Sequence, residues 1–301
     1  MTKNLTRANQ RDVGLAVLAF LIAFVLWQMQ GLFFLTYPLR LFVTMIHELG
    51  HGLAAILTGG SFLHFEVTRR GAGLAYTSGG SRFVVIQAGY LGTALFGAAL
   101  LLLTHRTTRP QRVAIGVGLF VGVLTLFYSG ISLANLGLFE LLLSVSVIVA
   151  GGYMLLTRDM DDGRYLLGAG VLAGGALLLL VFAGGGNTLT IFVGLASAVI
   201  LVAIGQYASR DVVVVVLTFL AFLTGLQAIT DAWVLFKIVS LPDSMMPLND
   251  ASSMARETGG SASLWALVWI ALDIMVFGTA VYVTLIRPYR HQSATLTLRS
   301  R

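Results

Sequence analysis

The sequence predicts an all-α polytopic membrane protein, a helical bundle of roughly eight or nine transmembrane spans with one small membrane-associated β-hairpin. Three observations support this fold class. Hydrophobic residues make up 57% of the 301 residues and charged residues only 11%, whereas charged residues make up about a quarter of a soluble domain. The apolar residues fall into runs of the roughly 20 residues that a spanning helix needs. One short segment alternates with a period of two, which is typical of a strand.

The composition also predicts how the chain is organised. No polar stretch exceeds roughly 25 residues, so a single integral membrane domain is expected over residues 1–301. The net charge is +6, but the arginines stand at span ends and in short loops, which indicates membrane orientation and argues against nucleic-acid binding. The chain has no cysteine, so any metal must be held by histidine, aspartate or glutamate.

The elements follow from the apolar runs. A basic N-terminal segment precedes a run at 13–34 that is too long for a signal-peptide core and is expected to remain as the first span. Tyr37-Pro38 then breaks the chain, and a helix is predicted over 39–57, ending at Gly59-Gly60. Further spans are predicted at 83–104, 113–128, 133–156, 165–182, 189–206, 212–238 and 264–286.

Nine spans create a conflict of orientation. Both ends of the chain are basic and both favour the cytoplasm, yet an odd number of spans places them on opposite sides. Either one run is re-entrant or one end departs from the rule. Between the last two predicted spans the sequence has one long polar loop, at about 240–261.

The β-hairpin is predicted over about 61–81. Leu63, Phe65 and Val67 alternate with polar residues, a turn rich in arginine and glycine follows at 69–73, and a second short alternating run comes after it. A lone hairpin is marginally stable in water, so it is expected to lie against the membrane domain. Its exposed edge suits pairing with an extended substrate segment. A purely structural role as a cover for the bundle is an equal alternative.

The run at 39–57 contains the motif His47-Glu48-Leu49-Gly50-His51. Two histidines four residues apart on a helix face the same way and can hold one metal ion, as in zinc proteases. Ionisable residues inside a membrane span are costly and are usually functional. We therefore expect one Zn²⁺ ion held by His47 and His51, with Glu48 as the catalytic base and not as a ligand.

The third protein ligand must come from another helix. Five acidic residues lie in or beside apolar runs, namely Glu140, Asp211, Asp231, Asp250 and Asp273. Asp211 fits a helix start and Glu140 a mid-span polar partner. Asp231 falls at the depth of the histidines on a helix expected to run parallel to theirs, but depth does not exclude Asp273. Asp250 stands in Asn249-Asp250-Ala251-Ser252, which fits a helix N-cap equally well.

The motif helix and several later segments resemble the site-2 protease family of intramembrane zinc metallopeptidases, in its smaller bacterial and plant-like branch. The similarity covers most of the chain. The segments are Thr58-Gly59-Gly60, the hairpin, Ala88-Gly89-Tyr90-Leu91-Gly92, Asp231-Ala232, Asn249-Asp250-Ala251 and Trp265-Ala266-Leu267-Val268-Trp269.

The resemblance implies a zinc-dependent protease that cleaves membrane-anchored proteins. It implies His47 and His51 as ligands and Glu48 as the catalytic acid and base. The Leu-Asp-Gly motif that carries the third ligand in better-known members is missing, since the chain has Leu272-Asp273-Ile274. Asp231 is favoured by its place in the smaller-branch pattern, with Asp273 and Asp250 as alternatives.

The preferred function is hydrolysis of peptide bonds in membrane-anchored protein substrates by zinc-activated water. The protein is expected to be a multi-pass protein embedded in a lipid bilayer, the bacterial plasma membrane. Two other classes remain open. A catalytically silent membrane scaffold or chaperone would keep the motif for structure, and a metal or proton transporter would use the same intramembrane groups for passage. The presence of Glu48 beside both histidines argues against a scaffold.

Overall fold

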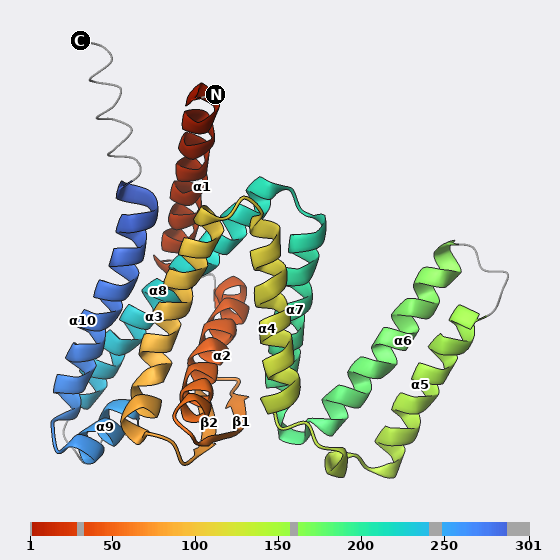
Figure 1. Ribbon diagram of the computed structural model, residues 1–301. Coiled ribbons are helices and arrows are strands. Elements are labelled where there is room, and N and C mark those ends of the chain that lie inside the picture. Colours follow the sequence, from red (N-terminus) through yellow and green to blue (C-terminus); the bar gives the residue numbers. More distant parts are fainter. Residues whose placement is uncertain (1, 29–32, 157–161, 241–248, 288–301) are drawn as a thin grey trace.

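A computed structural model describes residues 2–28, 33–156, 162–240 and 249–287. Its elements confirm the predicted fold class, a helical membrane protein with one small hairpin (Figure 1). The helices are α1 (Thr2–Gln28), α2 (Phe33–Leu57), α3 (Arg82–Arg106), α4 (Pro110–Tyr128), α5 (Leu138–Leu156), α6 (Asp162–Ala183), α7 (Thr188–Tyr207), α8 (Arg210–Val239), α9 (Asp250–Thr258) and α10 (Ala262–Val281), which ends in a π-helical turn at Tyr282–Ile286; the strands are β1 (Ser61–Val67) and β2 (Gly73–Ser78).

Six helices in the described part of the chain are long and apolar enough to cross a membrane: α3, α4, α5, α7, α8 and α10 with its π-helical turn. The chain is therefore an integral membrane protein. Helices α1, α2 and α6 occupy the three other predicted runs. Helix α2 carries Arg40, His47, Glu48 and His51 along its length, so its sequence is more polar than that of a lipid-facing span.

Side-chain contacts show the relative directions of α1, α2, α3 and α8. Asp12 of α1 pairs with Arg210, the first residue of α8, and Phe20 packs on Phe222 further along, so α1 and α8 are parallel. Helix α3 runs the other way, because Gly97 lies against Thr224 whereas His105 bonds to Thr218.

Helix α2 is antiparallel to α3 and thus has the direction of α1 and α8. Phe42 packs on Phe96, while Gly50, further along α2, lies against Ala88. Two consecutive helices that run in the same direction remove the orientation conflict of nine runs. The start of α1 and the end of α10 consequently lie at the same end of the bundle (Figure 1).

The boundaries differ from the predictions at three places. Pro38 lies inside α2 and not before it, because the helix begins five residues earlier, at Phe33. A proline in the second turn of a helix removes few backbone hydrogen bonds, so the helix continues through it. Glu140 lies in the first turn of α5 and not in mid-span, because the segment before it forms a separate short helix at Leu133–Asn135. The polar stretch at 240–261 contains α9.

The hairpin lies against the bundle, as predicted. Strands β1 and β2 are antiparallel, with Ser61 opposite Ser78 and Val67 opposite Gly73. The turn between them runs back along α2, where Thr44 donates a hydrogen bond to the carbonyl oxygen of Gly71. Gly71 has φ +82°, a left-handed conformation that favours glycine in a tight turn. The hairpin is therefore fixed beside the motif helix that precedes it.

Candidate metal centre

The two motif histidines lie on one face of α2. Their ring centroids are 4.8 Å apart, the consequence of a four-residue spacing on a helix. The small residues of α2 let α3 come close, since a Cβ on Gly50 would overlap the Ala88 carbonyl oxygen. This contact confirms that α2 is thin at the motif. It also brings the first turns of α3 directly onto the histidines.

The orientation of His51 is set by α3. Its Nδ1 atom lies 2.7 Å from the carbonyl oxygen of Val85. A carbonyl oxygen only accepts, so Nδ1 carries the proton and donates, which leaves the lone pair on Nε2. Metal-binding histidines are held in this way, with one ring nitrogen bonded to a backbone carbonyl and the other free for the ion.

His47 is held by aromatic packing. Its ring lies nearly perpendicular to that of Tyr90, at a centroid distance of 4.7 Å, and Tyr90 stacks on Trp269 of α10 at 5.2 Å. Trp269 is fully buried. A ring fixed between rigid buried groups loses little freedom when it binds an ion, so the centre is preorganised from both α3 and α10.

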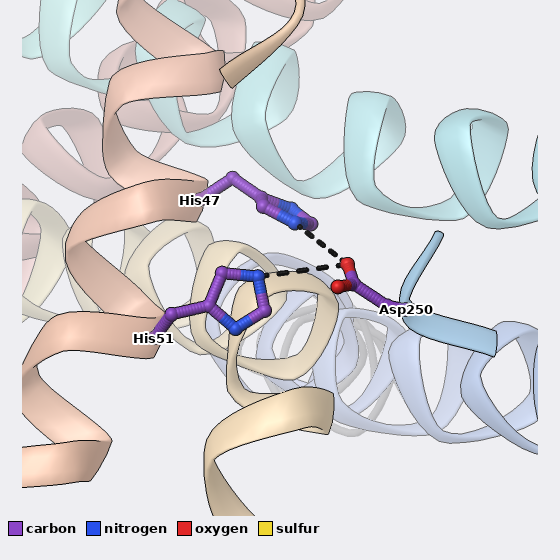
Figure 2. A group of neighbouring side chains, drawn as sticks. All are labelled: His47, His51 and Asp250. Carbon is purple, nitrogen blue, oxygen red and sulfur yellow. Dashed lines mark hydrogen bonds and ion pairs between the residues drawn. The ribbon is translucent and has the colours of Figure 1, made fainter. Parts of the chain in front are cut away.

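A carboxylate from α9 completes the group. The Oδ2 atom of Asp250 lies 3.4 Å from Nε2 of His47 and 3.5 Å from Nε2 of His51 (Figure 2). One ligand atom from each of these three residues lies within 4.8 Å of the other two. Among the described residues, this is the group that could hold a metal ion. Burial acts to raise the pKa of the Asp250 carboxyl, but the two imidazoles outweigh burial and hold that pKa below its usual value.

The cap of α9 explains why Asp250 is available. Asn249 is the N-cap, and its side chain accepts from the backbone of Ser252 in a reciprocal capping box. Asp250 is thus the first helical residue, and its carboxylate is not used for capping. Sequence reasoning treated an N-cap and a ligand as competing roles for this segment. The structure gives the cap to Asn249 and places the Asp250 carboxylate beside the two histidines.

The donor set fits zinc. Two imidazole nitrogens and one carboxylate oxygen form a common zinc-binding set that leaves one position open. Ligands about 2.1 Å from a tetrahedral ion lie roughly 3.4 Å apart, which is close to the 3.4 and 3.5 Å between the Asp250 oxygen and the two histidine nitrogens. Gly89 keeps the space between the imidazoles clear, because a Cβ there would overlap Nε2 of both histidines.

Asp231 and Asp273, the other two candidates, are outside the three-residue group. Asp231 accepts a hydrogen bond of 2.7 Å from Gln227, one turn away on α8, and it lines the same cavity as the histidines. It is not a member of the three-residue group. Asp273 is fully buried in α10, and its oxygens have no hydrogen-bond partner among the described residues.

Asp211 and two histidines outside the motif have partners of their own. Asp211 lies in the first turn of α8, as predicted, and pairs with Arg11. His64 stacks on Tyr76 across the hairpin. His105 bonds to Thr218. None of these side chains belongs to the three-residue group.

A cavity of about 890 Å³ opens over the centre. The hairpin turn, β2, α2, the start of α3, α8 and α9 all contribute to its lining. Strand β2 has a partner on one side only, since the sheet contains two strands, and four of its six residues line the cavity: Gly73, Leu74, Ala75 and Thr77. The cavity can therefore hold an extended chain beside β2.

Glu48 lies between this strand and the histidines. Only 6% of its surface is exposed, and a Cβ on Gly73 would overlap its carboxylate. Gly73 thus leaves room for Glu48, and Gly89 leaves room for the two histidines. Sequence reasoning missed the roles of Val85, Gly89, Tyr90 and Gly73. The one available signal was the Ala88-Gly89-Tyr90 segment.

Comparison with known families gives an independent result. Residues 15–155 and 142–280 match the family model described as Peptidase M50B-like. No curated protein and no solved structure matches the chain significantly. The matched segments span most of the sequence and include His47, His51 and Asp250. The chain therefore belongs to the Peptidase M50B-like family, which confirms its resemblance to the site-2 protease metallopeptidases.

Proposed function

We propose that the protein hydrolyses peptide bonds in membrane-anchored proteins, with one zinc ion held by His47, His51 and Asp250 and with Glu48 as general base. The convergence of three ligand atoms beside Glu48 supports this function. The proposal replaces Asp231 by Asp250 as third ligand, because the Asp250 oxygen is near both imidazoles whereas Asp231 bonds to Gln227.

Each group has a distinct part in the reaction. When bound, zinc polarises the scissile carbonyl and acidifies the attacking water. The Glu48 carboxylate takes the proton of that water and passes it to the amine that leaves. Because Glu48 is buried beside the histidines, its carboxylate is held next to the site at which the attacking water would lose its proton.

The substrate is expected to bind as an extended chain. A spanning helix hides its peptide bonds in internal hydrogen bonds, so it must unwind locally before hydrolysis. The free edge of β2 would supply backbone partners to the unwound segment. Helix-breaking residues near the cleaved bond should therefore favour cleavage.

Proline substitutions in β2 test this docking. Successive strand residues point their N–H groups to opposite edges, and the N–H of Ala75 is already bonded to Glu48. Leu74→Pro therefore removes one bond to β1, and Thr77→Pro removes one donor at the free edge without touching the bond to Glu48. The variant without the free-edge donor should have a raised KM and an unchanged zinc content. Equal KM values in wild type and both variants would show that the substrate does not pair with β2.

Glu48→Gln tests the reaction itself. The variant should keep stoichiometric zinc, measured by elemental analysis of purified protein, and lose turnover of a membrane-anchored model substrate in proteoliposomes. Glu66→Gln, on the hairpin, is the matched control and should keep both properties. Full activity in Glu48→Gln would refute the proposed base. Zinc flux into the proteoliposomes without peptide hydrolysis would identify a transporter, and a wild type with neither activity would identify a scaffold.

A further inference from the structure

Among the described residues, Tyr90 of α3 is the one tyrosine that lines the cavity over the metal centre. Only 9% of its surface is exposed. A buried tyrosine hydroxyl usually finds a hydrogen-bond partner, but that of Tyr90 has none in the described part of the chain. The fully enclosed side-chain atoms without a partner belong to other residues, namely Ser129, Ser144, Trp269, Asp273 and Thr284. The Tyr90 oxygen therefore has its open surface on the cavity.

Packing from two sides fixes the position of this hydroxyl. The Tyr90 ring stacks on Trp269 of α10, with the two ring planes 14° apart, and it lies at 88° to the ring of His47. The preceding residue, Gly89, is the one that lies against Nε2 of both histidines. A group held in this way loses little freedom when it binds a substrate.

The charges around Tyr90 place it beside the reacting groups. Asp250 has the largest electrostatic effect on Tyr90, followed by Asp231, Glu48 and Asp273. The proposed third ligand and the proposed base are thus both within electrostatic range of the phenol. A tyrosine hydroxyl keeps its proton at neutral pH and can donate it in a hydrogen bond.

Glu48 and Tyr90 reach the centre from different walls of the cavity. The Glu48 carboxylate lies against Gly73 of β2 and accepts a hydrogen bond from the backbone of Ala75. Tyr90 comes from α3, with α10 behind it (Figure 1). A peptide bond that lies beside β2 at the metal centre therefore has a proton acceptor on one wall and a hydrogen-bond donor on another.

We propose that the Tyr90 hydroxyl donates a hydrogen bond to the carbonyl oxygen of the bond that is cut. This role rests on the proposed function. When water adds to the carbonyl carbon, its oxygen bonds to that carbon and its proton passes to Glu48. The electron pair of the C=O π bond moves to the carbonyl oxygen, which becomes negatively charged. That pair then returns, the C–N bond breaks, and the leaving amine takes the proton from Glu48.

Tyr90 keeps its own proton throughout. Its hydrogen bond is strongest while the carbonyl oxygen is negative. The hydroxyl therefore stabilises the transition state more than the bound substrate, which raises kcat and leaves KM nearly unchanged.

Tyr90→Phe tests this role, because it removes the hydroxyl and keeps the ring that packs on His47 and Trp269. With a membrane-anchored substrate in proteoliposomes, kcat should fall about 100-fold or more, as when one oxyanion donor is lost. KM and zinc content should stay as in wild type. Tyr128→Phe is the matched control, since Tyr128 stacks on Phe62 and does not line the cavity, and it should keep its kcat.

A binding measurement separates this role from simple packing. A phosphinic peptide carries a tetrahedral, negatively charged group in place of the scissile carbonyl. Its affinity, measured by calorimetry, should fall in Tyr90→Phe by about the same factor as kcat/KM. The affinity for the uncut substrate, measured with Glu48→Gln in both proteins, should not change.

Two results would overturn the role of Tyr90. One is an unchanged kcat with an unchanged affinity for the phosphinic peptide. The other is a loss of zinc with an equal loss of affinity for substrate and phosphinic peptide, which would make Tyr90 a packing partner of His47. Failure of the proposed function looks different, because wild type itself would then lack turnover. If that wild type still bound the phosphinic peptide more tightly than Tyr90→Phe, the hydroxyl contact would stand, and equal or absent binding would refute it as well.

Discussion

Gly89 of α3 lies directly against His51 of α2, so that a Cβ on residue 89 would overlap the Nε2 atom of that histidine. The same Cβ would overlap Nε2 of His47. A helical glycine is ordinarily destabilising by roughly 0.5–1 kcal/mol relative to alanine. Its presence here has a local reason, the space in which the two ring nitrogens converge.

Gly89→Ala is therefore expected to abolish stoichiometric zinc binding while the protein still folds. The added methyl group occupies the position toward which both ligand nitrogens point, and helix propensity alone would favour the variant. Zinc per chain and the thermal unfolding midpoint in detergent are the measurements. Gly116→Ala, on α4 with open space around the new Cβ, is the matched control and should keep its zinc. A Gly89→Ala protein with full zinc would contradict the assigned centre.

The two carboxylates on the cavity wall should behave differently. Asp250→Ala removes a proposed ligand and is expected to lower zinc affinity by more than the 10–100-fold typical of an outer partner. Asp231→Ala leaves both imidazoles and Asp250 in place and should keep stoichiometric zinc. Competition with a chromophoric chelator measures both affinities. Weak binding in Asp231→Ala with tight binding in Asp250→Ala would restore Asp231 as the ligand.

The sequence alone predicts much of this centre, because its strongest signals are local. The spacing of His47 and His51 and the alternation of β1 depend only on helix and strand periods. The proposed third ligand is different, since Asp250 is separated from His47 by about 200 residues and meets it only through the packing of α9. Its neighbour Asn249 supplies the cap, a division of roles that composition does not reveal.

The sequence predicts the fold to about the same extent as it predicts the metal centre. Run length identifies the spans, because a bilayer sets their minimum length. Run length says nothing about direction, and nine runs were expected to alternate. The parallel course of α1 and α2 depends on contacts between distant residues, such as Asp12 with Arg210. The start of α2 before Pro38 is a boundary effect of the same kind, since helix ends are the least predictable part of an element.

The place of Glu48 depends on β2. Because a Cβ on Gly73 would overlap the Glu48 carboxylate, Gly73→Ala is expected to displace the proposed base without touching a proposed metal ligand. Misplacement of a reacting group by about 1 Å costs on the order of 100-fold in rate, so kcat should fall by about that factor while zinc content stays stoichiometric. Ala72→Ser, at an exposed position in the turn, should leave kcat unchanged. An unaltered kcat in Gly73→Ala would show that Glu48 tolerates displacement and is not the base.

Asp273 provides a test of a residue outside the centre. Its carboxyl group is fully buried in α10 without a hydrogen-bond partner in the described part of the chain, and a buried polar group left unsatisfied costs roughly 1–3 kcal/mol. Asp273→Val removes that cost at similar volume. The expected result is a higher thermal unfolding midpoint with unchanged zinc content and turnover, whereas Asp273→Asn, which keeps a buried polar group, should unfold near the wild-type midpoint. Loss of zinc in both variants would make Asp273 a ligand. Loss of turnover with zinc retained would give it a part in the reaction, although it is not a member of the three-residue group.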